Sequence, residues 1–308
     1  MNDAAETRTG LGYGFTAYLL WGLFPLFFPL LAPAGWLEIL AQRILWSLVV
    51  VAALLAFTRR GFGGVKRVLR NRYQFARLAG AAFLITVNWA VYIWGVNNGH
   101  VVECSLGYFI NPLFTILLGV VILKERLRPA QWAAVGIGTI AVVVIAVDYG
   151  RPPWIALTLA ASFGLYGLLK KKARVGAADS LVIETGVLAV PSAIALTFVA
   201  TQGDLAFAHH SVANTLLLAC SGLVTAVPLL FFAAATQRLP LSVVGLLQYL
   251  TPVLQFIVGV GIRHESVPGA EYAGFCLVWL ALIVLTADTL RRQRANSRVA
   301  REKHAAVV

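Results

Sequence analysis

Long apolar runs separated by short polar segments occupy nearly the whole chain. Runs of about 17 to 25 apolar residues can cross a bilayer as helices. Such runs lie at residues 10–31, 36–57, 77–97, 102–123, 130–147, 153–169, 181–200, 212–236, 241–262 and 268–289. Stretches such as LVVVAALLAF lack the alternating polarity of strands in a transmembrane barrel. The pattern predicts an all-α integral membrane protein with ten transmembrane helices, the first retained rather than cleaved.

The composition agrees with a membrane location. Of the 308 residues, 59% are apolar and 12% are charged, and the mean hydropathy is +0.81, whereas soluble domains are roughly half apolar. The three cysteines, Cys104, Cys220 and Cys276, fall in apolar runs without the spacing of a disulfide framework or a metal site. We therefore expect no metal and no cofactor.

The net charge of +12 is distributed over alternate loops. Basic residues gather at residues 58–77, 124–128 and 170–174 and after Leu290, while residues 201–211 contain no lysine or arginine. The positive-inside rule then places both termini in the cytoplasm and predicts a multi-pass protein of the inner cell membrane. Because no aromatic residues interleave with these basic clusters in a recognised motif, nucleic acid is not an expected partner.

The second half of the chain repeats the first. Residues 95–125 align without a gap on residues 235–265, at an offset of 140. The matching pairs are Leu106/Leu246, Pro112/Pro252, Gly119/Gly259, Val120/Val260, Ile122/Ile262 and Glu125/Glu265. Two copies of five helices must enter the membrane in opposite orientations because five is odd. The sequence thus predicts an inverted 5+5 repeat, residues 1–148 and 149–290, followed by a basic tail at 291–308; such repeats are typical of transporters.

A proline lies near the middle of two repeat-related helices, at Pro112 and Pro252. Proline frees a backbone carbonyl, and in lipid such a break persists only where protein or a water-filled cavity satisfies that carbonyl. A packing kink is the alternative explanation for either proline alone. Polar residues beside both prolines, including Tyr108, Asn111 and Gln248, favour helix breaks that border a cavity.

Arg43 and Glu184 are charged residues that lie about a turn or more inside predicted helices, and they align at an offset of 141. A charge at the centre of a bilayer costs about 2.5 to 3.5 kcal/mol on insertion scales, so it usually has a partner or a function. Two interpretations remain open for each: a substrate or coupling role, including proton coupling through Glu184, or a structural ion pair. By depth, Glu103 is the nearest candidate partner for Arg43.

Aromatic and amide side chains also gather deep in the third helix, where Asn88 and Tyr92 lie one turn apart on the same face. Trp and Tyr near helix ends usually mark the membrane interface, but these positions are deeper and fit a pocket wall. The candidate cavity residues are Arg43, Asn88, Trp89, Tyr92, Tyr108, Asn111, Glu184, Gln248 and Tyr249.

Several longer motifs resemble one known family. They are YLLWGLFPLFF (18–28), EILAQRILWS (38–47), NWAVYIWGVNNGHVVECSLGYFINPL (88–113), YGLLKKK (166–172) and QYLTP (248–252). The chain is similar in these segments to the RarD-type permeases of the EamA branch of the drug/metabolite transporter (DMT) superfamily. The resemblance implies ten helices, an inverted 5+5 repeat and a central cavity, and it associates the chain with chloramphenicol sensitivity.

Enzyme motifs do not fit their surroundings. GIGTIA (136–141) matches a dinucleotide-binding pattern but lies inside a predicted membrane helix, where glycines more simply permit close helix packing. We therefore predict no enzyme activity and no catalytic residue. The expected function is that of a secondary transporter, an exporter of small organic molecules by alternating access, with an amphipathic or aromatic substrate. A passive channel or a lipid-handling protein is the alternative.

Overall fold

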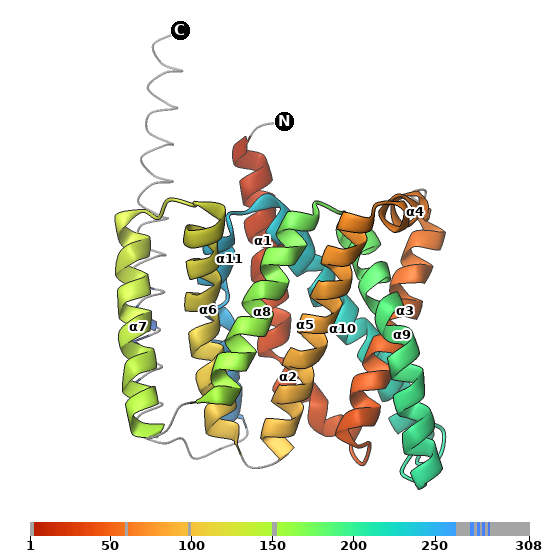
Figure 1. Ribbon diagram of the computed structural model, residues 1–308. Helices are drawn as coiled ribbons and strands as arrows, with labels where there is room; N and C mark the ends of the chain where they lie inside the picture. Colours follow the sequence, from red (N-terminus) through yellow and green to blue (C-terminus); the bar gives the residue numbers. More distant parts are fainter. Residues whose placement is uncertain are drawn as a thin grey trace, which may run out of the picture.

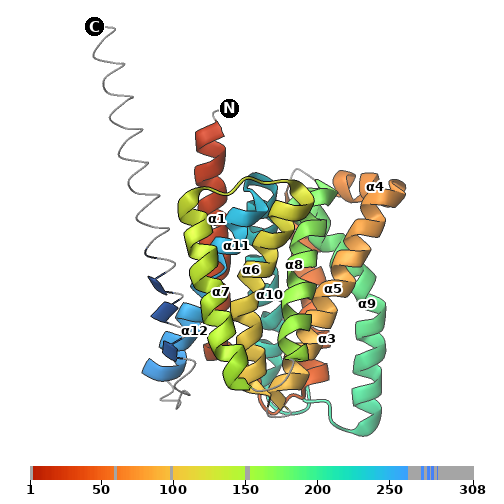
Figure 2. The same ribbon diagram turned by 60° about the vertical axis from the view of Figure 1, so that its left-hand side comes forward.

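A computed structural model describes residues 3–58, 61–97, 100–149 and 153–262, together with a few residues between 272 and 283. In these residues the regular structure is entirely helical, and most helices run side by side in one bundle (Figures 1 and 2). The helices are α1 (Asp3–Gly22), α2 (Phe24–Phe27), the 3₁₀ helix η1 (Phe28–Leu31), α3 (Trp36–Phe57), α4 (Gly63–Arg70), α5 (Arg72–Asn97), α6 (Val101–Leu123), α7 (Pro129–Tyr149), α8 (Trp154–Ala173), α9 (Ala177–Gln202), α10 (Val212–Arg238), α11 (Leu241–Leu247) and α12 (Leu250–Gly261).

Six helical segments of the described chain are long and apolar enough to cross a membrane. They are Ala5–Leu31, Trp36–Phe57, Arg72–Gly95, Leu106–Leu123, Ala177–Gln202 and Val212–Arg238. Large apolar side chains are exposed on the outside of the bundle, such as Phe83 (66% exposed) and Leu216 (60% exposed), and suit a lipid surround. The chain is a multi-pass membrane protein. The predicted tenth helix (268–289) and the tail (291–308) lie largely or wholly outside the described residues.

The first predicted helix, residues 10–31, is broken in the structure, which corrects the prediction of one continuous segment. α1 ends at Gly22, and the chain continues through the short α2 and η1. Pro25 and Pro29 each lie in the first turn of a short piece. Because proline lacks the N–H that a continuing helix needs, each of these positions favours the start of a new helix.

The two predicted proline breaks differ from one another. The segment containing Pro252 is divided at Gln248 and Tyr249, between α11 and α12. α6, in contrast, continues as one α-helix through Pro112, so the predicted break there is wrong. A single proline removes one hydrogen bond of the ladder, and the bonds on either side are sufficient to keep the helix continuous here.

α4 is a short helix that links α3 to α5 and lies across one end of the bundle (Figure 1). Its Val65 and Val68 are buried, while Lys66, Arg67 and Arg70 line its other faces. The segments joining α6 to α7 and α8 to α9 lie at the same end and are also rich in lysine and arginine. We call this end, at the top of Figure 1, the basic end. This helix was not expected, since the basic residues at 58–77 were predicted to lie in a loop between membrane helices.

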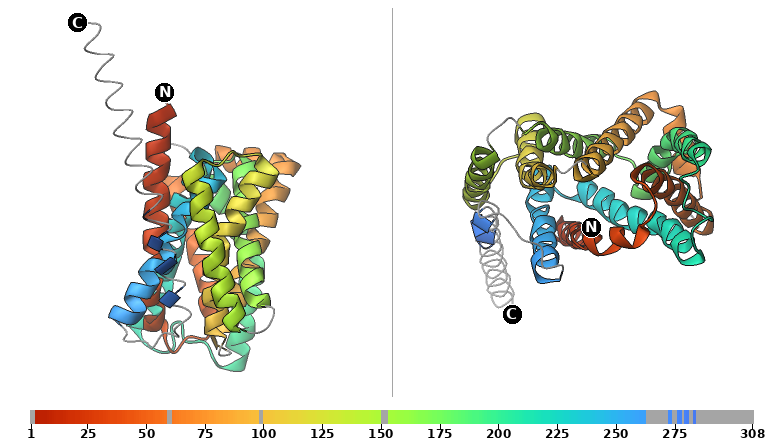
Figure 3. Two further views of the ribbon diagram at one scale, coloured as in Figure 1. Left: turned by 90° about the vertical axis from the view of Figure 1, so that its left-hand side faces the viewer. Right: turned by 90° about the horizontal axis from the view of Figure 1, so that it is seen from below.

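Helices from the two halves of the sequence interleave in the bundle. α3 packs against α9 and α10, α5 and α6 pack against α8, and α1 packs against α10. Figures 1 and 3 place α7 and α9 at opposite edges. The main core joins these helices through large buried rings, including Tyr166 and Phe232, which stack with centroids 5.6 Å apart.

Small residues set the closest helix approaches. A Cβ atom on Gly222 of α10 would lie 2.3 Å from Cβ of Trp46 on α3, so only glycine fits. At the same crossing, Ser47 Oγ donates a hydrogen bond to the Gly222 carbonyl (3.0 Å). Such contacts replace the hydrophobic driving force that is weak between helices in lipid.

Two buried glutamates each accept hydrogen bonds from the backbone of a distant element. Glu38 of α3 accepts from the N–H groups of Ala206 (3.0 Å) and Phe207 (2.8 Å), between α9 and α10. Glu103 accepts from Ile155 N–H (2.6 Å) at the start of α8. Carboxylates at backbone N–H groups form strong, charge-assisted bonds. Both carboxylates are fully buried.

Candidate functional site

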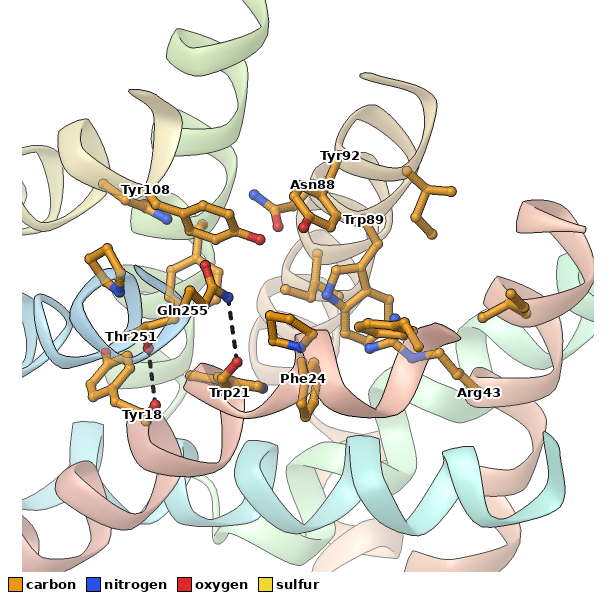
Figure 4. A pocket seen from close by; sticks show the side chains of 18 of the residues that line it. Tyr18, Trp21, Phe24, Arg43, Asn88, Trp89, Tyr92, Tyr108, Thr251 and Gln255 are labelled. Carbon is orange, nitrogen blue, oxygen red and sulfur yellow. Dashed lines mark hydrogen bonds between the residues drawn. The ribbon is translucent and has the colours of Figure 1, made fainter. Parts of the chain in front are cut away.

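A cavity of about 450 Å³ lies between α1, α2, η1, α3, α5, α6, α8, α11 and α12 (Figure 4). Its lining residues are Tyr18, Trp21, Phe24, Pro25, Phe28, Pro29, Ala34, Trp36, Ile39, Arg43, Ile85, Asn88, Trp89, Tyr92, Ile93, Tyr108, Asn111, Phe163, Gln248, Thr251, Pro252 and Gln255. Both halves of the sequence contribute. The volume is within the range of about 300 to 1,000 Å³ typical of small-molecule pockets.

The cavity extends from the middle of the bundle toward the end opposite the basic end. Tyr18, Asn111 and Gln248, which line its inner part, lie near the middle of their membrane segments. Ala34 and Trp36, at the turn between η1 and α3, line its outer part. A molecule entering from that end would therefore reach the centre of the bundle.

Arg43 of α3 lies in the cavity wall with its guanidinium among aromatic rings (Figure 4). Its Cζ is 4.7 Å from the ring centroid of Trp89, 5.1 Å from that of Phe28 and 5.9 Å from that of Phe24. The Nε–H donates to Thr225 Oγ1 (2.9 Å). Ring faces attract a cation and hold the guanidinium plane in place.

The expected ion pair between Arg43 and Glu103 is absent, since Glu103 instead accepts from Ile155 at the start of α8. Within the described ranges, no carboxylate forms a salt bridge with Arg43. Depth alone had suggested Glu103, but α6 and α3 are separated by the cavity and by α5. The charge of Arg43 therefore faces the cavity without a protein counter-ion in the part of the chain described.

Helix α5 supplies amide and phenol groups. Asn88 Nδ2 donates to the Leu159 carbonyl (2.9 Å) and to Ser162 Oγ (3.0 Å), which fixes the amide against α8. The rings of Tyr92 and Tyr108 meet edge to face with centroids 5.5 Å apart. The predicted pocket residues of α5 and α6 are thus brought together on one wall.

The broken segment α11–α12 is hydrogen-bonded to α6 on one side and to α1 on the other. Thr115 Oγ1 of α6 donates to Gln248 Oε1 (3.3 Å), and Thr251 Oγ1 donates to the Tyr18 carbonyl (3.1 Å). Gln255 Nε2 donates to the Trp21 carbonyl (3.5 Å), as Figure 4 shows. These bonds attach both sides of the break to the helices that line the cavity.

Two buried polar atoms on cavity-lining residues have no hydrogen-bond partner within the described chain: the Tyr18 hydroxyl and Asn111 Oδ1. Buried polar groups are nearly always satisfied by protein, water or ligand. Together with the rings and Arg43, they give the cavity a mixed polar and aromatic lining.

Comparison with known proteins agrees with this architecture. The profile of the EamA-like transporter family matches residues 8–147. Protein RarD of Streptomyces exfoliatus is 54% identical over 296 residues, which cover 96% of this chain and 94% of that protein. The chain belongs to the RarD proteins of the EamA-like transporter family. The resemblance found from the sequence motifs is thereby confirmed, and the chain is a membrane transporter of the DMT type.

Two further comparisons support the RarD assignment and the fold. Protein RarD of Escherichia coli (strain K12) is 40% identical over 299 residues, covering 96% of this chain and all of that protein (100%). A crystal structure with 20% sequence identity superposes with a TM-score of 0.68 and covers 91% of this chain and 98% of its own. At that identity, the structural likeness concerns the fold alone.

The structure places two of the predicted cavity residues of this RarD-family chain elsewhere. Glu184 lies between α8 and α9, where it pairs with Lys170 Nζ (2.5 Å) and accepts from Ser180 Oγ (2.6 Å) and the Tyr166 hydroxyl (3.2 Å). α8 continues to Ala173 and α9 begins already at Ala177, so Lys170 belongs to a helix and not to a loop. Glu184 is therefore in a buried ion pair outside the cavity.

Tyr249 is the second residue placed elsewhere. It is fully buried against Leu106, Phe109 and Ala156, and its hydroxyl approaches Gly138 of α7. Gln248 and Tyr249 are neighbours at the helix break, so their side chains leave the backbone in different directions. Only Gln248 faces the cavity.

Several lining residues were not predicted, above all Tyr18, Trp21, Phe24 and Phe28 on the broken first segment. A signal was available in the sequence, because FPLFFPL carries two prolines within an apolar run, as at Pro112 and Pro252. A break in a membrane helix is tolerated where it borders protein or a cavity.

Proposed function

We propose that this protein is a secondary transporter that exports small organic molecules across the inner membrane by alternating access. The observation that supports this most directly is a cavity, lined by both halves of the sequence, that extends in the described part of the chain from the middle of the bundle toward the end opposite the basic end. Binding at the midplane between repeats is typical of such transporters.

The proposal includes ten membrane helices in an inverted 5+5 repeat, with both termini in the cytoplasm. Equivalent positions at the offset of 140 support it: Tyr108 and Gln248 both line the cavity, as do Asn111 and Thr251. α6 and α11 also pack together in opposite directions, as an inverted repeat requires.

At the basic end, hydrogen bonds between the halves and within the second half close the path. The Glu125 carboxylate, following α6, accepts from the N–H groups of Leu241 (2.7 Å) and Ser242 (2.8 Å) at the start of α11. Gln237 Nε2 donates to the Lys170 carbonyl (2.7 Å), and Lys171 Nζ donates to the Leu239 carbonyl. With the basic end in the cytoplasm, this arrangement corresponds to an outward-facing state.

The cavity lining favours an amphipathic substrate. Its rings offer flat apolar faces to aromatic groups, and its amides, phenols and guanidinium offer specific polar contacts. An inorganic ion would leave most of this apolar surface uncovered.

Proton coupling through Glu184 is a further part of the proposal. Hydrogen bonds to Ser180 and Tyr166, besides the pair with Lys170, give this carboxylate partners that exchange protons. Carboxylates inside membrane helices commonly form proton relays.

Transport can be tested in inside-out vesicles from cells that express the protein, incubated with a metabolite extract of the same cells. We expect particular organic compounds to accumulate saturably, relative to vector-only vesicles, and to exchange in counterflow. Flux without counterflow stimulation would instead identify a channel. Movement of a labelled phospholipid without metabolite uptake would identify a lipid-handling protein.

A further inference from the structure

The guanidinium of Arg43 is the least satisfied charge of the cavity. The residue is only 5% exposed, yet its hydrogen bonding within the described chain is limited to Nε–H and Thr225 Oγ1. The two terminal nitrogens therefore have donors to spare on the side that borders the cavity. A buried charge is rarely left without a paired group.

Nearby carboxylates do not supply that group. Glu38, five residues earlier on α3, is occupied by the N–H groups of Ala206 and Phe207. Glu103 accepts from Ile155 N–H. The protein thus holds these two acids on backbone donors and leaves the arginine facing the cavity.

The geometry around Arg43 suits a planar anion. A guanidinium presents parallel N–H groups that match the two oxygens of a carboxylate, forming a bidentate pair. Phe28 and Trp89 lie against the guanidinium, with ring centroids 5.1 and 4.7 Å from Cζ, and such rings restrict its rotation and its hydration. The strength of such a pair increases where water is excluded.

The remainder of the cavity indicates what the anion is attached to. In Figure 4, Arg43 lies at one side and Tyr18 and Thr251 at the other, with Trp21 and Phe24 between them. Tyr18, whose hydroxyl has no hydrogen-bond partner within the described chain, thus lies on the opposite side of the cavity from Arg43 in this view. This order matches a molecule with a carboxylate at one end and an apolar or aromatic body.

We propose that the cavity recognises organic anions, with a carboxylate paired to Arg43 and an aromatic or apolar body against Trp21 and Phe24. The proposal rests on the proposed function in so far as it takes this cavity to be the transport site. It assigns to that site a substrate class defined by charge.

Binding to the purified, full-length protein in lipid nanodiscs tests this inference without requiring transport. The probes are benzoate, phenylacetate and indole-3-acetate, each compared with its neutral amide of nearly the same shape. We expect at least one carboxylate to bind about 10-fold more tightly than its amide, because only the anion forms the bidentate pair. Calorimetry or tryptophan fluorescence gives the dissociation constants.

Substitutions at Arg43 test whether this residue causes the preference for the carboxylate. Arg43→Gln should remove the preference for the carboxylate, and Arg43→Lys should retain part of it because the charge remains without the planar fork. Arg238→Gln, which removes an equal charge from the end of α10, should bind like the wild type. The wild-type comparison of acid with amide remains decisive even where Arg43→Gln folds poorly.

Two outcomes would overturn the inference: amides that bind as tightly as their acids throughout the panel, or an unchanged preference in folded Arg43→Gln protein. If the transport function itself is wrong, the results differ from these two outcomes. Anions would then bind in an Arg43-dependent way while vesicles show no counterflow. Counterflow of neutral or cationic compounds that is insensitive to Arg43→Gln would preserve transport and exclude the anion site.

Discussion

Trp21 of α1 and Phe163 of α8 meet edge to face in the cavity wall, with ring centroids 5.7 Å apart and planes inclined at 80°. They occupy equivalent positions in LLWGLF and ASFGLY, at an offset of 142. Ring pairs of this geometry contribute about 0.5 to 1.5 kcal/mol beyond the area they bury. The contact therefore joins the two halves of the sequence at the proposed substrate site.

Replacing Trp21 with alanine should weaken substrate binding about 10-fold, because it removes both the ring facing the cavity and the support of Phe163. Trp21→Phe should preserve most of the affinity. Trp132→Ala, on the exposed outside of α7, is the matched control. The measurement is the dependence of uptake into vesicles on substrate concentration. Equal half-saturating concentrations in Trp21→Ala and the wild type would contradict the assignment of Trp21 to the substrate site.

Glu184→Gln should lower the amount of folded protein. The buried Lys170–Glu184 pair, with both side chains 2% exposed, would lose one partner, and an uncompensated buried charge costs about 3 to 5 kcal/mol. The double variant Lys170→Met/Glu184→Leu should recover most of the stability because no charge is stranded. Thermal unfolding of detergent-solubilised protein compares the three, and a single variant as stable as the wild type would refute a structural role.

The same double variant tests proton coupling. If Glu184 carries the coupled proton, an imposed pH gradient should drive substrate accumulation in wild-type vesicles but not in vesicles containing Lys170→Met/Glu184→Leu. Downhill counterflow should persist in both, which shows that the protein is folded. Wild-type transport indifferent to the gradient would end the coupling hypothesis.

Glu125→Gln should loosen closure at the basic end. Its carboxylate caps the start of α11 with two hydrogen bonds, and bonds to charged groups contribute about 1.5 to 3 kcal/mol each. Thr236 is fully buried nearby. A cysteine introduced there should react several-fold faster with an impermeant maleimide in the Glu125→Gln protein than in the protein with Glu125 intact, when the reagent is added to inside-out vesicles. Glu125→Asp serves as the conservative comparison, and an unchanged labelling rate would argue against a gate here.

The proposed topology places residues 201–211 outside the cell. A cysteine at Gln202, which is exposed at the end of α9, should be labelled by an impermeant thiol reagent in intact cells. Gly203 is less suitable, since its backbone has φ of +78° and strains any other residue. Labelling that appears only after lysis would invert the topology.

Hydropathy located several of the membrane helices because a membrane helix must satisfy its own backbone and offer apolar side chains to lipid. α3, expected at 36–57, is Trp36–Phe57 in the structure. The break after Gly22 was not predicted, since the residues that follow are as apolar as a continuous helix would be. α4 was missed because an eight-residue helix is too short to give a strong periodic signal.

Cavity residues were predictable where one helix presents a polar face, as with Asn88 and Tyr92 on α5. They were not predictable where tertiary contacts decide the partner. Glu184 is intramembrane as expected, but its pairing with Lys170 depends on how far α8 and α9 extend. Arg43 was assigned to the cavity without knowledge that both nearby acids are held by backbone N–H groups.

The residue pairs that line the two halves of the cavity are equivalent in position but differ in chemistry: Tyr108 corresponds to Gln248, and Asn111 to Thr251. Under the proposed alternating access, a perfectly repeated protein would have outward-facing and inward-facing states of equal free energy. The differences between the halves remove that equality, and a difference of about 1.4 kcal/mol would already place ten molecules facing one way for each facing the other. On this proposal, the residues that differ between the halves set the resting orientation of the empty protein.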